Sequence, residues 1–375
     1  MNLFFILVIF VHTLANSYIF IRGWQALPPS LVLKIVYIVL FIFLYSAFII
    51  AMAGRNTLSL GFQKVLYSAG TSWLAWMLYL VLFFLLTDGV HLLNRFFHFL
   101  PDVVGNNPKL FHRIQALGGI LLVLILTTIG YIRFSNPVVE TIRLQVSKKA
   151  GSRKNLRVVA FSDVHLGLTV DKNRLSGYVE LINKQKPDIV LISGDLVDNN
   201  LRPLNEERMH EELNQIEAPL GIYACLGNHE YLSGIEKSLD FYSKTKIRLL
   251  IDRVVRVDDS FWVIGRDDRM NAKRKLLSEL VGRTDTTQPL ILLDHQPYHL
   301  EQAEKNGIDL QISGHTHNGQ MWPLNLLVNK IYELGYGLKQ KGKTLVYTSS
   351  GLALWGPPFR IGTQSELVVF DICFE

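Results

Sequence analysis

The chain has 375 residues, 49% of them hydrophobic, and a formal net charge of +6. Residues 1–134 contain 8 basic and 2 acidic side chains, so the whole basic excess lies there, and the 30 basic and 30 acidic residues that follow cancel. A neutral C-terminal part does not indicate a nucleic-acid-binding protein. The two cysteines offer no disulfide framework, which agrees with a reducing compartment.

The first 134 residues are predicted to be a transmembrane region that crosses the membrane four times. An apolar stretch of about 20 residues is long enough to span a bilayer as a helix. The first such stretch lacks a basic region before it and three others follow, so we interpret it as a span rather than as a signal peptide. The four predicted spans cover residues 3–21, 31–53, 69–93 and 114–134.

Polar residues within or near these spans have two possible roles. His12, Asn16 and Asp88 could form a polar relay or a pocket for lipid headgroups, because ionisable groups in a membrane often mark function. Alternatively, they pack between helices or reach toward the membrane surface. The second role is the more common one, and we expect it here.

The basic residues that flank the spans predict an orientation. Four spans leave both termini on one side, where eight lysines and arginines adjoin the spans, against five on the opposite side. Segments rich in basic residues stay in the cytoplasm. We therefore expect a multi-pass protein of the cell (inner) membrane with a cytoplasmic C-terminal part.

Residues 135–154 are predicted to be a basic juxtamembrane linker. Ile142, Leu144 and Val146 alternate with polar residues, which predicts an edge strand. The basic residues that follow either bind anionic lipid or are simply solvated. They are Lys148, Lys149, Arg153 and Lys154.

From residue 155 onward, short apolar runs alternate with helical stretches, which predicts an open α/β sheet. The runs that we expect to be strands are 157–161, 188–193, 221–226, 289–293 and 309–313. The helices are expected at roughly 171–185, 204–216, 234–245, 273–281 and 299–306.

A polar motif follows each of the five strand runs. Asp163 and His165 are two residues apart, as are His315 and His317, so on an extended strand each pair points to one face. Glycines at the turns let the backbone approach a ligand. The motifs are Ser162-Asp163-Val164-His165, Gly194-Asp195-Leu196-Val197-Asp198, Gly227-Asn228-His229-Glu230, Asp294-His295 and Gly314-His315-Thr316-His317.

Each motif alone has a simpler explanation. An Asp-x-His pair is often an ordinary surface pair, Gly-Asp a turn, and Asn-His-Glu a helix N-cap. Five such motifs, each at the end of a strand, make these explanations improbable together. Carboxylate, amide and imidazole groups are suitable ligands for two divalent cations. The sequence therefore predicts metal-assisted hydrolysis at phosphorus.

The five motifs, in this order, resemble the calcineurin-like metallophosphoesterase superfamily over roughly residues 155–372. The stretches 349–352 and 357–362 are similar to the closing segment of its bacterial membrane-associated branch. Asn318 departs from that branch, which more often has glycine there. The resemblance implies a four-layer α/β/β/α sandwich at residues 155–375, with the site at the C-terminal edges of two sheets.

The resemblance also implies a role for each site residue. His229 would be a general acid or an oxyanion stabiliser, oriented by Asp198. The two divalent ions would be Mn²⁺ in the first place, with Fe or Zn²⁺ as alternatives, about 3.5–4 Å apart, with a bridging hydroxide as the nucleophile. One ion would be held by Asp163, His165, Asp195 and His317, and the other by Asp195, Asn228, His295 and His315.

We therefore expect a membrane-bound binuclear phosphoesterase that hydrolyses a phosphodiester or a pyrophosphate. A tethered site meets its substrate at the bilayer, which favours a lipid-linked substrate or a nucleotide-linked acyl sugar, as the resemblance also suggests. Two alternatives stay open: a soluble substrate, or a non-enzymatic receptor or scaffold with a vestigial catalytic domain. The oligomeric state is not predicted. Arg360 either reaches a phosphate or is an ordinary surface arginine.

Overall fold

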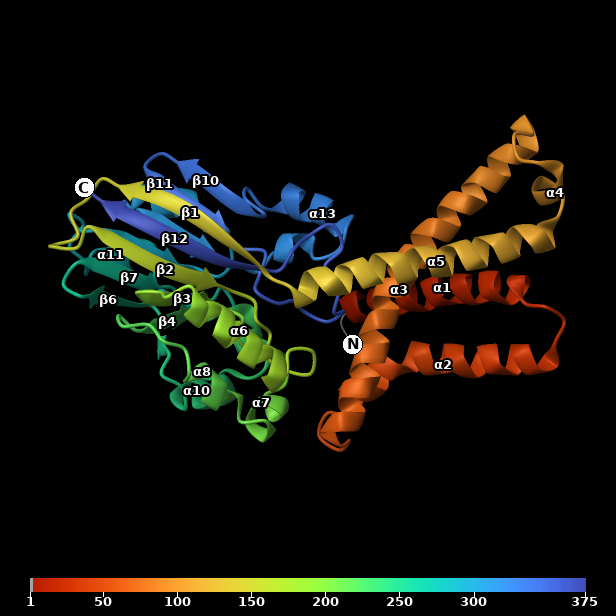
Figure 1. Ribbon diagram of the computed structural model, residues 1–375, viewed down its shortest axis with the longest axis horizontal. Helices are drawn as coiled ribbons and strands as arrows, with labels where there is room; N and C mark the ends of the chain where they lie inside the picture. Colours follow the sequence, from red (N-terminus) through yellow and green to blue (C-terminus); the bar gives the residue numbers. More distant parts are fainter. Residues whose placement is uncertain (1–2) are drawn as a thin grey trace. The chain divides into compact units, whose positions relative to one another are not determined.

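The computed structural model describes residues 3–375, with side-chain environments from residue 6 onward. The chain forms two compact units, Met1–Ile129 and Gly130–Glu375. Figure 1 shows helices alone in the first unit and two sheets with covering helices in the second.

The first unit confirms the prediction of apolar helices before an α/β domain. Its helices are α1 (Leu3–Ala26), α2 (Leu31–Ala53), α3 (Leu60–Phe97), the short α4 (Asp102–Gly105) and α5 (Pro108–Ser135). Four of them contain stretches that are long and apolar enough to cross a membrane: Ile6–Ala26, Leu31–Ala53, Leu60–Phe97 and Pro108–Ser135. Most of their large apolar side chains are exposed, as in helices that are surrounded by lipid.

Helix α3 extends beyond both ends of the predicted span, residues 69–93, into segments that contain polar side chains.

Within the first unit, Asp88 on α3 accepts hydrogen bonds from Arg22 (2.5 Å), Tyr18 (2.5 Å) and Gln115 (2.7 Å). These bonds join α1, α3 and α5. Asn16 is buried and accepts a hydrogen bond from the Trp73 indole at 2.9 Å. Asn16 and Asp88 therefore have the helix-packing role that we expected.

The second unit contains two six-stranded sheets. The first has the order β1-β12-β2-β3-β4-β5, and β2 to β5 are parallel. The β12 strand lies between β1 and β2, parallel to the former and antiparallel to the latter. The strands are β1 (Val138–Val146), β12 (Glu366–Phe374), β2 (Asn155–Phe161), β3 (Ile189–Ser193), β4 (Ile222–Cys225) and β5 (Arg248–Leu249).

The second sheet has the order β10-β11-β9-β8-β7-β6. Its four central strands are parallel, and each edge strand is an antiparallel hairpin partner of its neighbour. The strands are β10 (Gly337–Lys341), β11 (Thr344–Thr348), β9 (Leu310–Ser313), β8 (Leu290–Leu293), β7 (Phe261–Gly265) and β6 (Arg253–Val257).

Side chains that alternate along the strands divide the core into layers. On β2, Val158 packs between the two sheets with Ile291 of β8, whereas Val159 and Phe161 face the helices. A third cluster lies behind the second sheet and includes Ile264 and Leu280. The order of the layers is therefore α/β/β/α, as expected.

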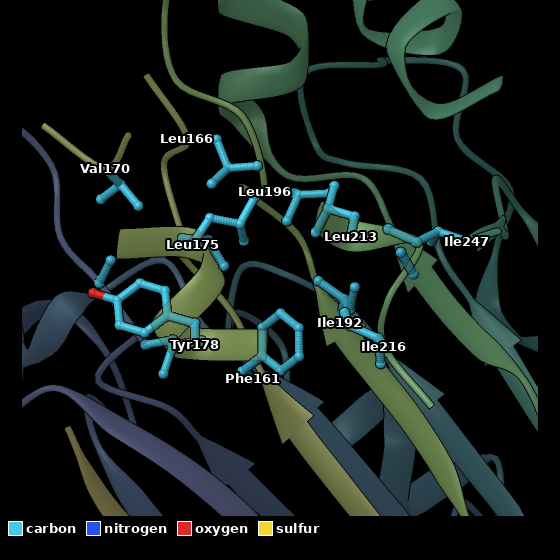
Figure 2. Close-up of a cluster of buried hydrophobic side chains, with 14 of the residues drawn as sticks. Phe161, Leu166, Val170, Leu175, Tyr178, Ile192, Leu196, Leu213, Ile216 and Ile247 are labelled. Atoms are coloured by element: carbon cyan, nitrogen blue, oxygen red, sulfur yellow. The ribbon is translucent and has the colours of Figure 1, made fainter. Parts of the chain in front are cut away.

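Helix α6 (Lys172–Lys184) shows how the sequence builds the outer layer. Asp171 caps it by accepting a hydrogen bond from Arg174 N at 3.2 Å, a contact typically worth about 1 kcal/mol. Leu175 and Tyr178 are three residues apart and lie on its buried face. Figure 2 shows both side chains in one cluster with Phe161 of β2, Ile192 of β3 and Leu213 of a short helix.

The remaining outer helices are shorter than predicted. The stretch 204–216 contains two short helices, and 273–281 contains only its last five residues as helix. Six strands lie where no strand was predicted: β5, β6, β7, β10, β11 and β12. The covering helices are α7 (Arg202–Glu206), α8 (Met209–Leu213), α9 (Asn228–Leu232), α10 (Ile235–Ser243), α11 (Leu277–Val281), α12 (Glu301–Lys305) and α13 (Leu324–Ile331).

Candidate metal centre

All five polar motifs lie directly after strands, at the carboxyl ends of both sheets. The β2 strand ends at Phe161, β3 at Ser193, β4 at Cys225, β8 at Leu293 and β9 at Ser313. The next residues in each case carry the predicted ligands. Parallel strands therefore deliver side chains from five distant parts of the sequence to one place.

The paired ligands converge for a different reason from the one expected. We expected Asp163 and His165 to lie on an extended strand, but both have left-handed backbones, with φ of 54° and 48°. The same holds for Asp195 (52°), His315 (72°) and His317 (49°). Such conformations are uncommon for residues other than glycine and cost about 1–3 kcal/mol each, and they gather at functional sites. Tight turns after the strands, not strand alternation, aim these side chains.

A first group of donors consists of Asp163, His165 and His317, whose ligand atoms all lie within 4.8 Å of one another. The two histidine Nε2 atoms are 3.1 Å apart. Asp163 Oδ1 is 3.5 Å from His317 Nε2 and 3.8 Å from His165 Nε2. Asp195 Oδ2 lies 3.7 Å from His165 Nε2, so its carboxylate adjoins this group.

A second group shares Asp195 with the first. Ligand atoms of Asp195, His295 and His315 lie within 4.8 Å of one another. Asp195 Oδ2 is 3.1 Å from His295 Nε2, and His315 Nδ1 is 2.8 Å from Asn228 Oδ1. All seven predicted ligands are thus brought together in two adjacent groups.

The two carboxylates are held in place and kept ionised. Backbone N–H groups donate to both: His229 N to Asp195 Oδ1 at 2.8 Å, and His315 N to Asp163 at 3.0 Å. Burial alone would raise both pKa values, but the neighbouring imidazoles outweigh it. His317 lowers the pKa of Asp163, and His295 lowers that of Asp195. Both therefore present negative charge to the site at neutral pH.

The donor set fits divalent cations. His295 Nδ1 lies 2.7 Å from the Ser193 carbonyl oxygen, to which it donates, so Nε2 is the nitrogen that faces the Asp195 carboxylate. An imidazole nitrogen and a carboxylate oxygen 3.1 Å apart require a cation between them, a proton or a metal ion. In the part of the chain that the structure describes, His295 Nε2 is buried without a hydrogen-bond partner. Metal coordination would satisfy it.

Two further imidazoles, those of His317 and His315, are available as neutral ligands. Burial lowers the pKa of His317 well below its ordinary value. Burial, together with the nearby His295, lowers the pKa of His315 to about 4. A neutral imidazole keeps the lone pair that a metal ion needs.

His229 lies beside both groups. Its ring is perpendicular to that of His165 at a centroid distance of 4.5 Å and lies 6.1 Å from Trp355. His229 Nδ1 is 3.3 Å from Asp198 Oδ1, close enough for an ion pair but too poorly aligned for a hydrogen bond. Burial alone lowers the pKa of His229, and Asp198 and Asp195 outweigh it and raise the pKa. His229 also lies close enough to His165 and Asp195 to join them around a cation.

Glu230 is a site residue that the sequence analysis did not single out. It is fully buried and accepts hydrogen bonds from the backbone N–H groups of Gly227 (2.7 Å), Leu196 (2.9 Å) and Asp195 (3.2 Å). It therefore ties the turn after β3 to the turn after β4. The N-cap explanation of Asn-His-Glu is also correct, because Glu230 is the third residue of α9 and caps Gly227.

Two glycines are needed because the turns pack directly on the carboxylates. A Cβ at Gly227 would collide with the carboxylate and backbone of Asp195. A Cβ at Gly314 would collide with Asp163 and with Ser162, whose hydroxyl donates to Asp163. Asn318 has a φ of 50°, so the position where glycine was expected holds the residue type that best tolerates a left-handed backbone.

Arg360 has neither of the roles that we considered. It is fully buried, and its guanidinium donates to the carbonyl oxygens of His317 (2.8 Å), Ser350 (2.5 Å) and Ala353. Burial lowers its pKa to about 10, so it stays charged. It holds the turn of His317 against the loop after β11 and does not face a phosphate. The sequence alone could not reveal this role of Arg360, because its partners are backbone atoms of residues that are distant in the sequence.

Comparison with known proteins agrees with this geometry. Residues 156–319 match the calcineurin-like phosphoesterase family. An uncharacterized metallophosphoesterase of Campylobacter jejuni is 29% identical over 385 aligned positions, which cover 99% of this chain and 98% of that protein. The match therefore includes the apolar helices.

Two further relatives match about two thirds of the chain. An uncharacterized metallophosphoesterase of Aquifex aeolicus is 32% identical over 62% of this chain and 93% of its own length. A transmembrane protein with a metallophosphoesterase domain from Danio rerio is 31% identical over 68% of this chain and 61% of its own length. The chain belongs to the calcineurin-like metallophosphoesterase family.

Proposed function

We propose that the protein is a membrane-bound hydrolase of phosphoric esters or pyrophosphates that uses two divalent metal ions. The observation that carries this proposal is the pair of donor groups that share the Asp195 carboxylate. A shared carboxylate is how a protein holds two cations close enough to act on one phosphoryl group. A receptor with a vestigial site has no reason to keep seven ligands and their supporting hydrogen bonds.

The ligand assignment follows the two groups. One ion would be bound by Asp163, His165, Asp195 and His317, and the other by Asp195, Asn228, His295 and His315. Mixed nitrogen and oxygen ligation suits Mn²⁺ first, and Fe or Zn²⁺ as alternatives. Bound ions supply Lewis acidity toward the phosphoryl oxygens and lower the pKa of a coordinated water.

His229 is our candidate for the general acid that protonates the leaving oxygen. Its pKa is raised above the ordinary value, and the 3.3 Å approach of Asp198 favours the protonated ring that a general acid needs. The ring lies beside His165, at the edge of the first donor group. As the alternative, His229 would be an additional metal ligand, because its ring nitrogen also lies within reach of Asp195.

A lipid-linked phosphodiester or pyrophosphate is the proposed substrate class. Four apolar helices are more than an anchor requires, and a tethered site meets lipids at the bilayer surface. The alternative is a soluble phosphodiester with the helices as a tether. We also propose the inner membrane with a cytoplasmic site, on the bias of basic residues toward the side that holds the termini.

A metal-dependent assay on the full-length protein tests the proposal. Hydrolysis of bis(p-nitrophenyl) phosphate should require added Mn²⁺ and stop with a chelator. Fractionated membrane lipids, read by mass spectrometry before and after incubation, should then lose a phosphate-linked species. Hydrolysis that continues at full rate in the apo protein would exclude the binuclear mechanism. Cleavage of the aryl ester without any change in the lipids would favour the soluble substrate.

A further inference from the structure

Helix α13 and the segment before it carry exposed apolar side chains. Trp322, Leu326, Leu327 and Ile331 are each 52–62% exposed, and α13 has no buried residue. We call these four side chains the α13 surface. Leu327 and Ile331 are one helical turn apart, with Leu326 beside them, so they form one continuous patch. A short helix with an exposed apolar face indicates a binding surface.

The α13 surface is built on the loop that carries two candidate metal ligands. Helix α13 follows the turn His317–Gly319, and Gly319 packs so closely on the backbone of Asn325 that a side chain there would collide. After α13, the Tyr332 ring lies 6.1 Å from the His315 ring. Thr316 Oγ1 donates to Gly335 O at 2.6 Å and closes the loop. The patch therefore lies at the edge of the metal centre.

Backbone hydrogen bonds link Trp322 to the end of an apolar helix. The last turn of α5, from Gly130 onward, belongs to the second unit, and Phe134 is buried in its core. Arg360 N donates to Gly130 O at 2.9 Å, and Trp322 N donates to Ile361 O at 2.7 Å. Two backbone hydrogen bonds and one peptide link therefore separate Trp322 from the end of the fourth candidate membrane span.

We propose that the α13 surface lies in the headgroup region of the bilayer and opens the metal centre toward the lipid surface. Tryptophan is enriched at this level of a membrane, and an amphipathic helix buries its apolar face about 5–10 Å into the boundary. Lys330 is exposed on the same helix and can pair with anionic headgroups. This binding surface does not depend on the reaction that the site catalyses.

Spin labels on the full-length protein in vesicles of equal parts phosphatidylcholine and phosphatidylglycerol test the proposal. Cys373 is exposed and is replaced by serine, whereas Cys225 is buried and stays unlabelled. Labels are placed at Leu327→Cys and Ile331→Cys. The matched control is Leu276→Cys, 63% exposed and next to α11, which lies at the opposite end of the second unit from α13 (Figure 1).

Collisions with lipid-soluble oxygen and with a water-soluble nickel chelate give the depth of each label. The labels at 327 and 331 should collide more often with oxygen than with nickel, and the label at 276 should show the reverse. Equal behaviour at all three positions would overturn the proposal. So would labels at 327 and 331 that are shielded from both reagents, because another copy or the chain's own helices would then cover the patch.

A charge substitution provides a second test with its own folding control. Leu327→Asp should move the label at 331 from oxygen-accessible to nickel-accessible, because burying a carboxylate in the boundary is unfavourable. In detergent, the same variant should bind as much Mn²⁺ as the parent protein. A label at 331 that stays oxygen-accessible in Leu327→Asp would contradict the proposal. Neither readout uses hydrolysis, so failure here is distinguishable from failure of the proposed function.

Discussion

The two units bury polar groups for opposite purposes. In the membrane-type unit, Asp88 accepts hydrogen bonds from three side chains of α1 and α5. Its carboxylate therefore holds these helices against α3. In the phosphoesterase unit, the buried carboxylate of Asp195 instead faces imidazole nitrogens. An unsatisfied buried group costs about 1–3 kcal/mol. In the phosphoesterase unit, a bound cation would offset that cost. The presence or absence of protein hydrogen-bond partners therefore distinguishes a buried polar group that packs helices from one that binds a ligand.

The largest expected effect tests the shared carboxylate. Asp195→Asn removes the negative charge that both donor groups use. We expect metal content to fall from about two ions per chain and turnover to fall by at least about 10³-fold, since removing even one preorganised donor costs about 10²–10³-fold. Elemental analysis and the aryl phosphodiester assay measure the two effects. Two ions retained with normal turnover would refute the binuclear assignment.

His229→Ala separates an acid from a ligand. As a general acid, His229 contributes about 10²–10⁴-fold to turnover, and its loss should leave both metal ions bound. The deficit should shrink for substrates with good leaving groups, because these need little protonation. If the variant instead loses one ion, His229 is a ligand and the role of acid must be reassigned.

Phe134→Ala tests how deeply the end of α5 enters the phosphoesterase core. The Phe134 side chain is 1% exposed, and the Arg174 guanidinium lies 4.1 Å from its ring centroid. Truncating a buried phenylalanine typically costs about 3–5 kcal/mol. The midpoint of thermal unfolding of the second unit should shift to lower temperature. The loss of bound metal on heating measures this midpoint. Phe97→Ala, which truncates an exposed phenylalanine at the end of α3, is the control and should have little effect.

The pH dependence of turnover tests the pairing of His229 with Asp198. The pKa of His229 is raised, so its acid form is fully present below the ordinary value and is lost as pH rises through the raised one. Turnover should therefore fall on the alkaline side. Asp198→Asn removes a cause of the raised pKa, so the alkaline fall should move to lower pH. An unchanged profile in Asp198→Asn would mean that another group titrates.

The smallest expected effect lies in the membrane-type unit. Asp88→Asn keeps the shape of the side chain but weakens its bonds to Arg22, Tyr18 and Gln115. Polar contacts between membrane helices contribute about 0.6 kcal/mol on average and up to about 1.7. We expect a loss of about 1 kcal/mol in the unfolding of the helices, measured by titration with a denaturing detergent, and unchanged metal content. Loss of turnover without loss of stability would instead reveal a functional role for Asp88.

The sequence by itself was sufficient to name the candidate ligands and to predict the strands that carry them. Motifs such as Gly194-Asp195 and Gly314-His315 end apolar runs, and strand ends in a parallel sheet meet at one edge whatever the loops do. The apolar helices were equally accessible, because span length and composition are local properties. The six unpredicted strands include edge strands, such as β6 and β10. They also include β12, whose place between β1 and β2 depends on partners more than 200 residues away.

Only the tertiary structure decided how the site is held together. The left-handed backbones of Asp163 and His317, the burial of Arg360 on distant carbonyls, and the four hydrogen bonds from backbone N–H groups to Glu230 leave no periodic or spacing signal. The residue type determines which ligand atom a position can provide. The backbone angle φ and the hydrogen-bond partners depend instead on what packs around the turn. The residue types in the motifs therefore determine the chemistry of the site, and tertiary packing determines the geometry of the site.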